Sequence, residues 1–116
     1  MPRARRITTR REIAHLLTGQ RARADTLELY WRPAAGLLPR ATCITPKHGH
    51  TGVERNQLRR RLKELMRQIL FRRPEALDYL VRSRPPAYGR TFAQLTEELT
   101  ALAARIEPVD AGIGPA

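Results

Sequence analysis

Cysteine is nearly absent from this 116-residue chain, in which Cys43 is the only one. A single cysteine excludes an internal disulfide and a zinc site built from several cysteines, and it fits a reducing setting. Long apolar runs are missing too: the longest stretch without Asp, Glu, Lys or Arg covers residues 13–20, which is too short to cross a membrane. No apolar signal-peptide core follows the basic start of the chain. We therefore expect a cytoplasmic protein that does not act at a membrane.

Acidic residues are scarce, with 11 Asp and Glu against 22 Lys and Arg, and the formal net charge is +11. Residues 1–90 hold 21 basic and 7 acidic side chains, whereas residues 91–116 hold one basic and four acidic ones. Twenty of the basic residues are Arg, whose planar guanidinium group binds phosphate through paired hydrogen bonds. This composition predicts a nucleic acid as the partner in preference to a membrane.

Recognisable catalytic motifs are also missing. The sequence has no GxSxG elbow, no P-loop, no HExxH, and no carboxylate pair on a plausible common face. His48 and His50 are spaced to touch a metal or a phosphate, but no further ligand stands nearby, so we expect no metal site. We interpret His15 as a packing or surface residue and Cys43 as a half-buried thiol. The chain by itself does not look like a catalyst.

Apolar residues make up 41% of the chain, which predicts one folded domain over residues 1–106. Within it, residues 1–8 are expected to form a flexible basic arm, and residues 107–116 a disordered tail. Three helix starts share the capping-box pattern, a threonine followed three residues later by Glu or Gln. These pairs are Thr9 with Glu12, Thr51 with Glu54, and Thr91 with Gln94.

Three strands are expected, at residues 26–32, 40–47 and 76–83. In the first strand the apolar residues alternate with polar ones, which puts Leu27 and Leu29 on one face and Glu28 and Tyr30 on the other. The predicted order is α-β-β-α-β-α. It indicates an α/β (α+β) two-layer sandwich with a small sheet of three or four strands, in which a basic helix connects two strands.

The basic helix spans residues 51–74, with eight Lys or Arg and two acids. Its apolar stripe follows a 3.6-residue period, and the opposite face carries Asn56, Arg60, Lys63 and Arg67 within about 60°. Such like charges repel one another unless a polyanion neutralises them, which favours a phosphate backbone over a merely solvated face. Arg61 points elsewhere, and we expect it to pair with Glu64.

The stretch RNQLRR, residues 55–60, resembles the Arg-Asn-Arg-x-Lys/Arg-Arg signature of the protein subunit of bacterial ribonuclease P. The resemblance covers nearly the whole chain, through residues 5–34, 43–49, 76–86 and 91–102. It implies a left-handed βαβ crossover and a ribonucleoprotein that removes the 5′ leader from precursor tRNA. It also implies that the RNA subunit, with Mg²⁺, performs the hydrolysis.

The resemblance further implies two binding regions, one along the basic helix for the catalytic RNA and one in a cleft between the first helix and the sheet for the leader. Three residues depart from the family pattern. Gln57 stands where the family has Arg, and Ile13 and Leu17 stand where it often has aromatic residues. The basic-helix residues are Arg55, Asn56, Arg59, Arg60 and Lys63, to which the face analysis adds Arg67. The cleft residues are Ile13, Leu17, Tyr30, Cys43, Thr45 and Lys47, with Tyr30 placed to stack on a leader base.

Two other functions fit the same charge. A structural, ribosome-associated RNA-binding protein would share the basic surface but show no affinity that depends on a leader. A DNA-binding protein would use the basic helix in a major groove, but no helix precedes it at helix–turn–helix spacing, and no dimerisation heptads appear. We therefore expect ribonuclease P RNA and precursor tRNA as partners, and not DNA.

Overall fold

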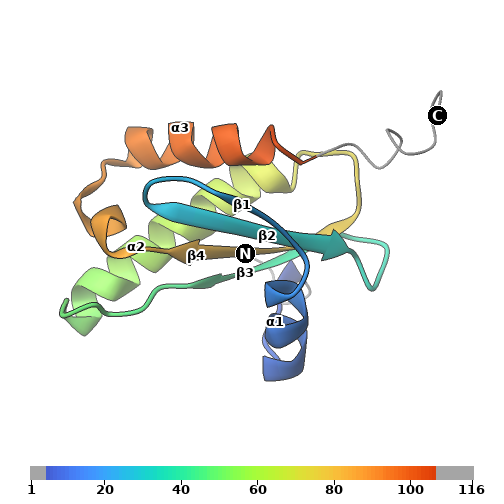
Figure 1. Cartoon of the computed structure of the whole chain (residues 1–116), viewed down its shortest axis with the longest axis horizontal. Helices are drawn as coiled ribbons and strands as arrows, with labels where there is room; N and C mark the ends of the chain where they lie inside the picture. Colours follow the sequence, from blue (N-terminus) through green and yellow to red (C-terminus); the bar gives the residue numbers. More distant parts are fainter. Residues whose placement is uncertain (1–4, 107–116) are drawn as a thin grey trace.

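The computed structural model describes residues 5–106 and shows a four-stranded mixed sheet with helices on both faces (Figure 1). It confirms the predicted α/β class. The elements in chain order are α1 (Arg10–Leu17), β1 (Gln20–Arg23), β2 (Leu27–Pro33), β3 (Arg40–Ile44), α2 (Gly52–Leu65), the π-helical turn η2 (Met66–Leu70), β4 (Leu77–Ser83), the 3₁₀ helix η3 (Pro85–Gly89) and α3 (Phe92–Ala103).

The strands lie in the order β1-β2-β4-β3. β2 pairs antiparallel with both β1 and β4, whereas β3 runs parallel to β4. Two parallel neighbours cannot be joined by a tight turn, so the chain leaves the sheet after β3 and returns to β4 through α2. The basic helix is therefore the crossover of a βαβ unit. The left hand of this crossover stays a prediction from the resemblance.

The sequence reasoning did not include β1. Its sequence, QRAR, has a single apolar residue, Ala22, so no repeated apolar position marks it as a strand. Pairing with β2 supplies the missing stability, because Ala22 stands opposite Leu29 and both are buried. The turn between the two strands is bound to α3, since Glu98 accepts hydrogen bonds from the backbone N–H groups of Thr26 (2.7 Å) and Leu27 (2.6 Å).

The larger core lies between the sheet and the pair α2–α3. Strand residues that alternate along β2 and β4 point into it, and the predicted helix stripes close it from the other side. The capping boxes of α2 and α3 are both formed as predicted. Phe92 lies in the first turn of α3 and is 39% exposed, outside the buried stripe of that helix. The fully buried large side chains on the helices are Leu62, Leu65, Met66, Leu70, Leu95, Leu99 and Leu102.

A smaller core lies on the opposite face, under α1. It contains Leu16 of α1, Tyr30 and Leu80 of the sheet, and Ile7, which is only 2% exposed. Residues 5–8 therefore do not form the flexible arm that their charge predicted. Burial of Ile7 draws the segment to the edge of β3, where its N–H donates to Ala41 O at 3.1 Å. Residues 1–4 and the predicted tail, 107–116, lie outside the described residues.

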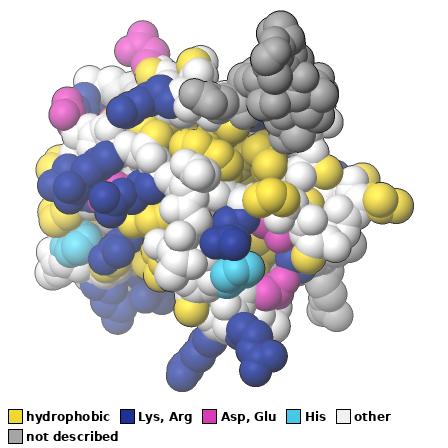
Figure 2. Space-filling model, turned by 45° about the vertical axis from the view of Figure 1, so that its right-hand side comes forward, with side chains coloured by type: hydrophobic (Ala, Val, Ile, Leu, Met, Phe, Trp, Pro, Cys, Tyr) yellow, Lys and Arg dark blue, Asp and Glu magenta, His cyan; other side chains and the backbone are white. Residues whose placement is uncertain are grey.

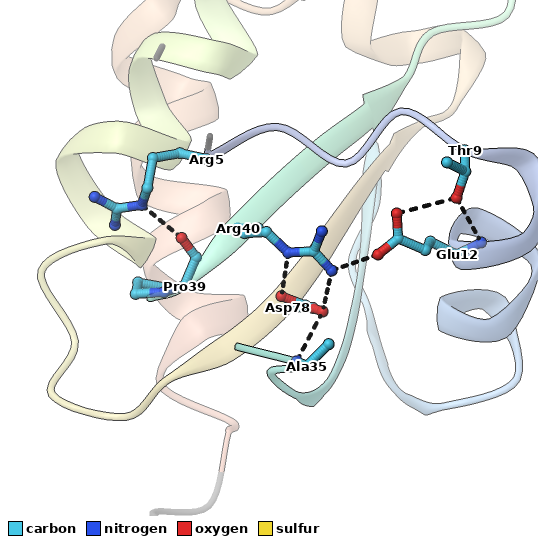
Figure 3. A network of polar contacts seen from close by, with 7 residues as sticks. All are labelled: Arg5, Thr9, Glu12, Ala35, Pro39, Arg40 and Asp78. Carbon is cyan, nitrogen blue, oxygen red and sulfur yellow. Dashed lines mark hydrogen bonds and ion pairs between the residues drawn. The ribbon is translucent and has the colours of Figure 1, made fainter. Parts of the chain in front are cut away.

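An ionic network attaches α1 to the sheet (Figure 3). Arg40 of β3 donates to both carboxylate oxygens of Asp78 on β4, from Nε at 3.3 Å and from Nη2 at 2.9 Å, and its Nη2 also contacts Glu12 of α1. Glu12 therefore completes only half of the predicted capping box: Thr9 Oγ1 accepts from the Glu12 N–H, but the carboxylate turns to Arg40 and the Thr9 hydroxyl. These two contacts, Arg40 first, lower the pKa of Glu12.

Gly19 follows the C-cap residue of α1, and its special role is close packing. Its N–H donates to Leu16 O at 2.9 Å, and its backbone passes against β2. A β-carbon at this position would lie 2.5 Å from Arg32 Cγ and 2.8 Å from the carbonyl oxygen of Trp31. Glycine therefore lets the chain turn tightly from α1 into β1.

Candidate nucleic-acid interface

The outward face of α2 gathers the predicted basic-helix residues. Because Leu58, Leu62 and Leu65 point into the larger core, the residues between them turn away from it. Asn56, Arg60 and Arg67 are exposed, and Arg55, Arg59 and Lys63 are half-buried at the flank of the helix. Lys and Arg side chains predominate over Asp and Glu on the face shown in Figure 2.

A narrow groove lies between α2 and the edge strand β3. Arg59 and Lys63 line it from the helix, Cys43 lines it from the strand, and Arg6 lines it from the N-terminal segment; the hollow measures about 120 Å³. Burial raises the pKa of the Cys43 thiol, and the positive charges of Arg59 and Lys63 oppose that rise. The two cations therefore face the strand edge as well as solvent, which makes a continuous positive strip from α2 to Arg6.

The prediction of an ion pair between Arg61 and Glu64 is wrong. Glu64 instead contacts Arg67, which donates from Nε at 3.2 Å and also from Nη2, and it accepts from Gln68 at 2.8 Å. These contacts, Arg67 first, lower the pKa of Glu64 to about 2. Arg67 thus already has an acidic partner, and it is the one of the five cations among the basic-helix residues that forms an ion pair within residues 5–106.

The residues of the predicted cleft do not all come together. Ile13 and Tyr30 pack in the smaller core under α1. Cys43 packs against the larger core beside α2, because it pairs with Val81, which faces that core. Thr45 shares the parity of Cys43 and is buried.

Tyr30 is only 4% exposed, and its hydroxyl donates to Glu28 at 3.2 Å. In this conformation a leader base cannot stack on its ring, which corrects the stacking role expected from the resemblance. Leu17 is 36% exposed and borders a shallow hollow of about 750 Å³ together with Trp31 and Arg32. Lys47 is exposed in the loop after β3.

Of the two loop histidines, His50 positions the start of α2. His50 stacks on Tyr88 with ring centroids 3.9 Å apart, and its Nδ1 lies 3.2 Å from Glu54. The Tyr88 hydroxyl donates to Pro46 O at 2.7 Å, which fixes the other side of the loop. His48 has a φ of 49°, in the left-handed region. Residues 5–106 contain no group of three His, Cys, Asp or Glu side chains that could hold a metal ion.

Four arginines that sequence reasoning missed surround the uncovered end of the α1 face. They are Arg21 and Arg23 of β1, Arg82 of β4, and Arg84, which follows β4. The available signal was the alternation of arginine in QRAR, which places two of them on one face of a strand. Because the predicted fold did not include β1, the alternation could not be assigned to one face of a strand.

Sheet topology, the basic crossover helix and the positive strip define a small basic α/β protein with a cluster of cations on its crossover helix. Among residues 5–106, no helix is both long enough and apolar enough to span a membrane. The sequence model of the family described as Ribonuclease P matches residues 1–107, and the chain belongs to this family.

Individual relatives agree with this assignment. The ribonuclease P protein component of Kocuria rhizophila is 33% identical over 67 residues, which cover 58% of this chain and 59% of that protein's length. The ribonuclease P protein of Staphylococcus aureus superposes with a TM-score of 0.78 at 20% identity, covering 88% of this chain and 94% of that one. The protein from Thermotoga maritima gives 0.77 at 21%, covering 89% and 98%. At such low identity the solved structures show a shared fold.

Proposed function

We propose that this chain is the protein subunit of a cytoplasmic ribonuclease P, which binds a catalytic RNA and promotes endonucleolytic removal of the 5′ leader from precursor tRNA. The observation that carries the proposal is the outward face of α2 in a chain that belongs to this family. Hydrolysis of the phosphodiester is assigned to the RNA subunit with Mg²⁺. The protein's own part is to bind and orient RNA.

Electrostatics support the role of α2. Arg60 and Lys63 stand one turn apart beside Arg59, and none of these three is among the ion pairs formed within residues 5–106. Packing such charges together is unfavourable in the free protein. A phosphate backbone reverses the sign of this interaction and releases counterions, so the same residues that repel one another contribute to binding.

The test is reconstitution. Purified protein, freed of nucleic acid, is assayed on precursor tRNA alone and after addition of a bacterial ribonuclease P RNA at low Mg²⁺. We expect no cleavage by the protein alone, and efficient cleavage at the leader junction when both are present. An Arg59→Ala/Arg60→Ala double variant should rescue poorly, whereas Arg61→Ala should behave like the unmodified protein. Cleavage by the protein alone, or no rescue with any such RNA, contradicts the proposal.

A second candidate is a structural RNA-binding protein without a leader site. The burial of Tyr30 favours it, because in this conformation the Tyr30 ring is not accessible to a leader base. The two candidates differ in one measurement, the affinity of the reconstituted particle for 5′-extended and mature tRNA. The ribonuclease P subunit requires tighter binding of the extended form, and equal affinities favour the structural role.

A further inference from the structure

The loop that leads into α2 ends in a tight turn. His48 and Gly49 both have a positive φ, 49° and 87°, so two consecutive residues lie in the left-handed region. The His50 N–H closes the turn by donating to Lys47 O at 2.8 Å. This turn places the His50 side chain at the junction between the loop, η3 and α2.

Two contacts hold the His50 ring. It stacks on Tyr88 of η3, with ring centroids 3.9 Å apart and ring planes 10° apart, and the Tyr88 hydroxyl in turn donates to Pro46 O. On the α2 side, His50 Nδ1 lies 3.2 Å from Glu54 Oε2. The other carboxylate oxygen of Glu54 accepts from the Thr51 N–H at 2.9 Å, as part of the capping box. The His50 ring therefore connects the first turn of α2 to η3.

The charge of Glu54 determines which nitrogen of His50 carries the proton. The contact with the Thr51 N–H, followed by that with His50, lowers the pKa of Glu54. Its carboxylate is therefore ionised at neutral pH and can only accept hydrogen bonds. Nδ1 of His50 then donates, and Nε2 is the nitrogen that takes up a further proton. Protonation thus gives the ring a positive charge without breaking its contact with Glu54.

Glu54 is the only acidic residue among residues 52–63 of α2, and it directly precedes Arg55 and Asn56 of the proposed interface. Among the ion pairs formed within residues 5–106, its partner is His50 and not an arginine. With a neutral His50, the carboxylate repels a phosphate that approaches the start of α2. With a protonated His50, the two charges cancel, and the repulsion is largely removed.

The other charged groups around the ring differ from His50 in their titration or their position. Arg55 lies close to Tyr88: burial raises the pKa of Tyr88, and the charge of Arg55 opposes this rise. Arginine, lysine and tyrosine, which include Lys47 of the loop, keep their charge states through the pH range in which histidine titrates. His48 titrates in that range, but it lines a different hollow, beside Arg84. His48 is therefore a natural control.

We propose that His50 is a positioning residue of the RNA interface, which holds Glu54 at the start of α2 and, when protonated, cancels its charge. This role rests on the proposed function, in which the outward face of α2 binds RNA. RNA binding then strengthens as the pH falls through the titration of His50. Because linkage is reciprocal, bound RNA also favours protonation of His50, and binding takes up protons.

The first experiment measures the affinity for a transcribed ribonuclease P RNA by filter binding, from about pH 8.5 to about pH 5.5 at constant ionic strength. The unmodified protein should bind about two- to fivefold more tightly at the acidic end, the size of one exposed ion pair. His50→Gln keeps a side-chain donor for Glu54 but does not titrate, so its affinity should change much less. His48→Asn is the matched control: asparagine tolerates the left-handed region, and the full change should remain.

The outcomes separate the role of His50 from the proposed function. RNA binding with the same pH dependence in His50→Gln as in the unmodified protein overturns the role of His50 and leaves the proposed function standing. Loss of the pH dependence in His48→Asn also contradicts that role, because the effect then belongs to the fold of the loop. No binding of the RNA at any pH overturns the proposed function, and the role of His50 with it.

The second experiment counts protons, a quantity that a merely structural role of His50 would not change. Calorimetry of RNA binding near neutral pH, in two buffers with different ionisation enthalpies, gives the proton uptake. The unmodified protein should take up a fraction of one proton, and His50→Gln should take up less. Equal uptake by these two proteins overturns the proposal.

Substitution of Tyr88 tests the stacking contact in the same assay. Tyr88→Phe keeps the stacked ring and loses the hydroxyl contact with Pro46, so the proton uptake should remain. Tyr88→Leu removes the ring, so His50 is no longer fixed beside Glu54 and the uptake should fall. Circular dichroism checks that both variants are folded. Equal uptake by two folded Tyr88 variants contradicts the positioning of His50 by stacking.

Discussion

Glu98 of α3 binds Thr26, 72 positions earlier in the chain, through both of its carboxylate oxygens. Oε1 accepts from the Thr26 hydroxyl at 2.6 Å, and Oε2 accepts from its backbone N–H at 2.7 Å. Oε2 also accepts from the N–H of Leu27. Thr26 and Leu27 are both fully buried. One carboxylate therefore satisfies three donors that water does not reach.

Glu98→Ala should therefore lower the free energy of unfolding by about 2–3 kcal/mol, because it leaves buried backbone donors without an acceptor. Denaturant unfolding, followed by circular dichroism, measures the loss. Glu97→Ala, at the exposed neighbouring position, is the matched control and should stay within about 0.5 kcal/mol of the unmodified protein. Equal effects at the two positions would mean that the turn does not depend on Glu98.

Gly19→Ala should destabilise the fold by about 1–3 kcal/mol, since the new β-carbon meets the Trp31 carbonyl oxygen, a backbone atom that cannot move cheaply. Gly36 gives the comparison, because a β-carbon there meets no atom within 4 Å. Gly36→Ala should be neutral or slightly stabilising through a less flexible unfolded chain. Thermal unfolding of both variants tests the pair, and a harmless Gly19→Ala would refute the close-packing role.

The attachment of α1 should weaken in acid. The folded-state pKa of Glu12 lies below its ordinary 4.5, with Arg40 as the main cause. A depressed pKa means that the stabilisation is fully present above about pH 4.5 and is lost as the pH falls through the lower folded-state value. Glu12→Gln should cost less than about 1 kcal/mol at neutral pH, because the pair is partly exposed.

The difference in unfolding free energy between Glu12→Gln and the unmodified protein should therefore shrink as the pH is lowered below 4.5. Urea unfolding over a pH series measures it. Glu97→Gln, on the exposed face of α3, serves as the reference substitution. A difference for Glu12→Gln that stays constant down to the lowest pH would show that the carboxylate charge does not hold α1.

Salt dependence of RNA binding should distinguish the faces of α2. Arg60→Ala and Lys63→Ala should each reduce the slope of log affinity against log salt by roughly 0.7–0.9, one phosphate contact each. Arg61→Ala should change the slope little, and Arg67→Ala should have an intermediate effect because Glu64 already compensates its charge. Filter binding to a structured RNA at several salt concentrations gives the slopes, and equal losses at all four positions would contradict the assignment of faces.

Local patterns predicted most of the fold. The capping boxes and the 3.6-residue stripes located α2 and α3, because both signals lie within one helix and need no distant partner. β1 was not predicted because its stability comes from pairing with β2 and from the contacts of Glu98, which is far away in the sequence. The burial of Ile7 was not predicted for the same reason, since the residues that it packs against include ones on β3 and α1.

The candidate site shows the same limit. Alternation correctly separates Leu27 and Leu29 from Glu28 and Tyr30, but it does not say which face each helix covers. Cys43 was therefore assigned to the α1 side although it faces α2. The choice of face depends on where the helices pack, and that information lies in contacts between elements.

Each edge strand of the sheet has features that disfavour its pairing with another sheet. At β3, the segment around Arg6 and Ile7 occupies part of the strand edge, with one backbone hydrogen bond to Ala41. At β1, the outer strand is four residues long and bears Arg21 and Arg23, so a second copy would bring like charges together. Aggregation through edge-to-edge strand pairing is therefore disfavoured even in the protein without a bound partner. Substitutions that remove the charges of β1 or detach Ile7 from the sheet should lower the solubility of the protein, an effect that a binding assay does not measure.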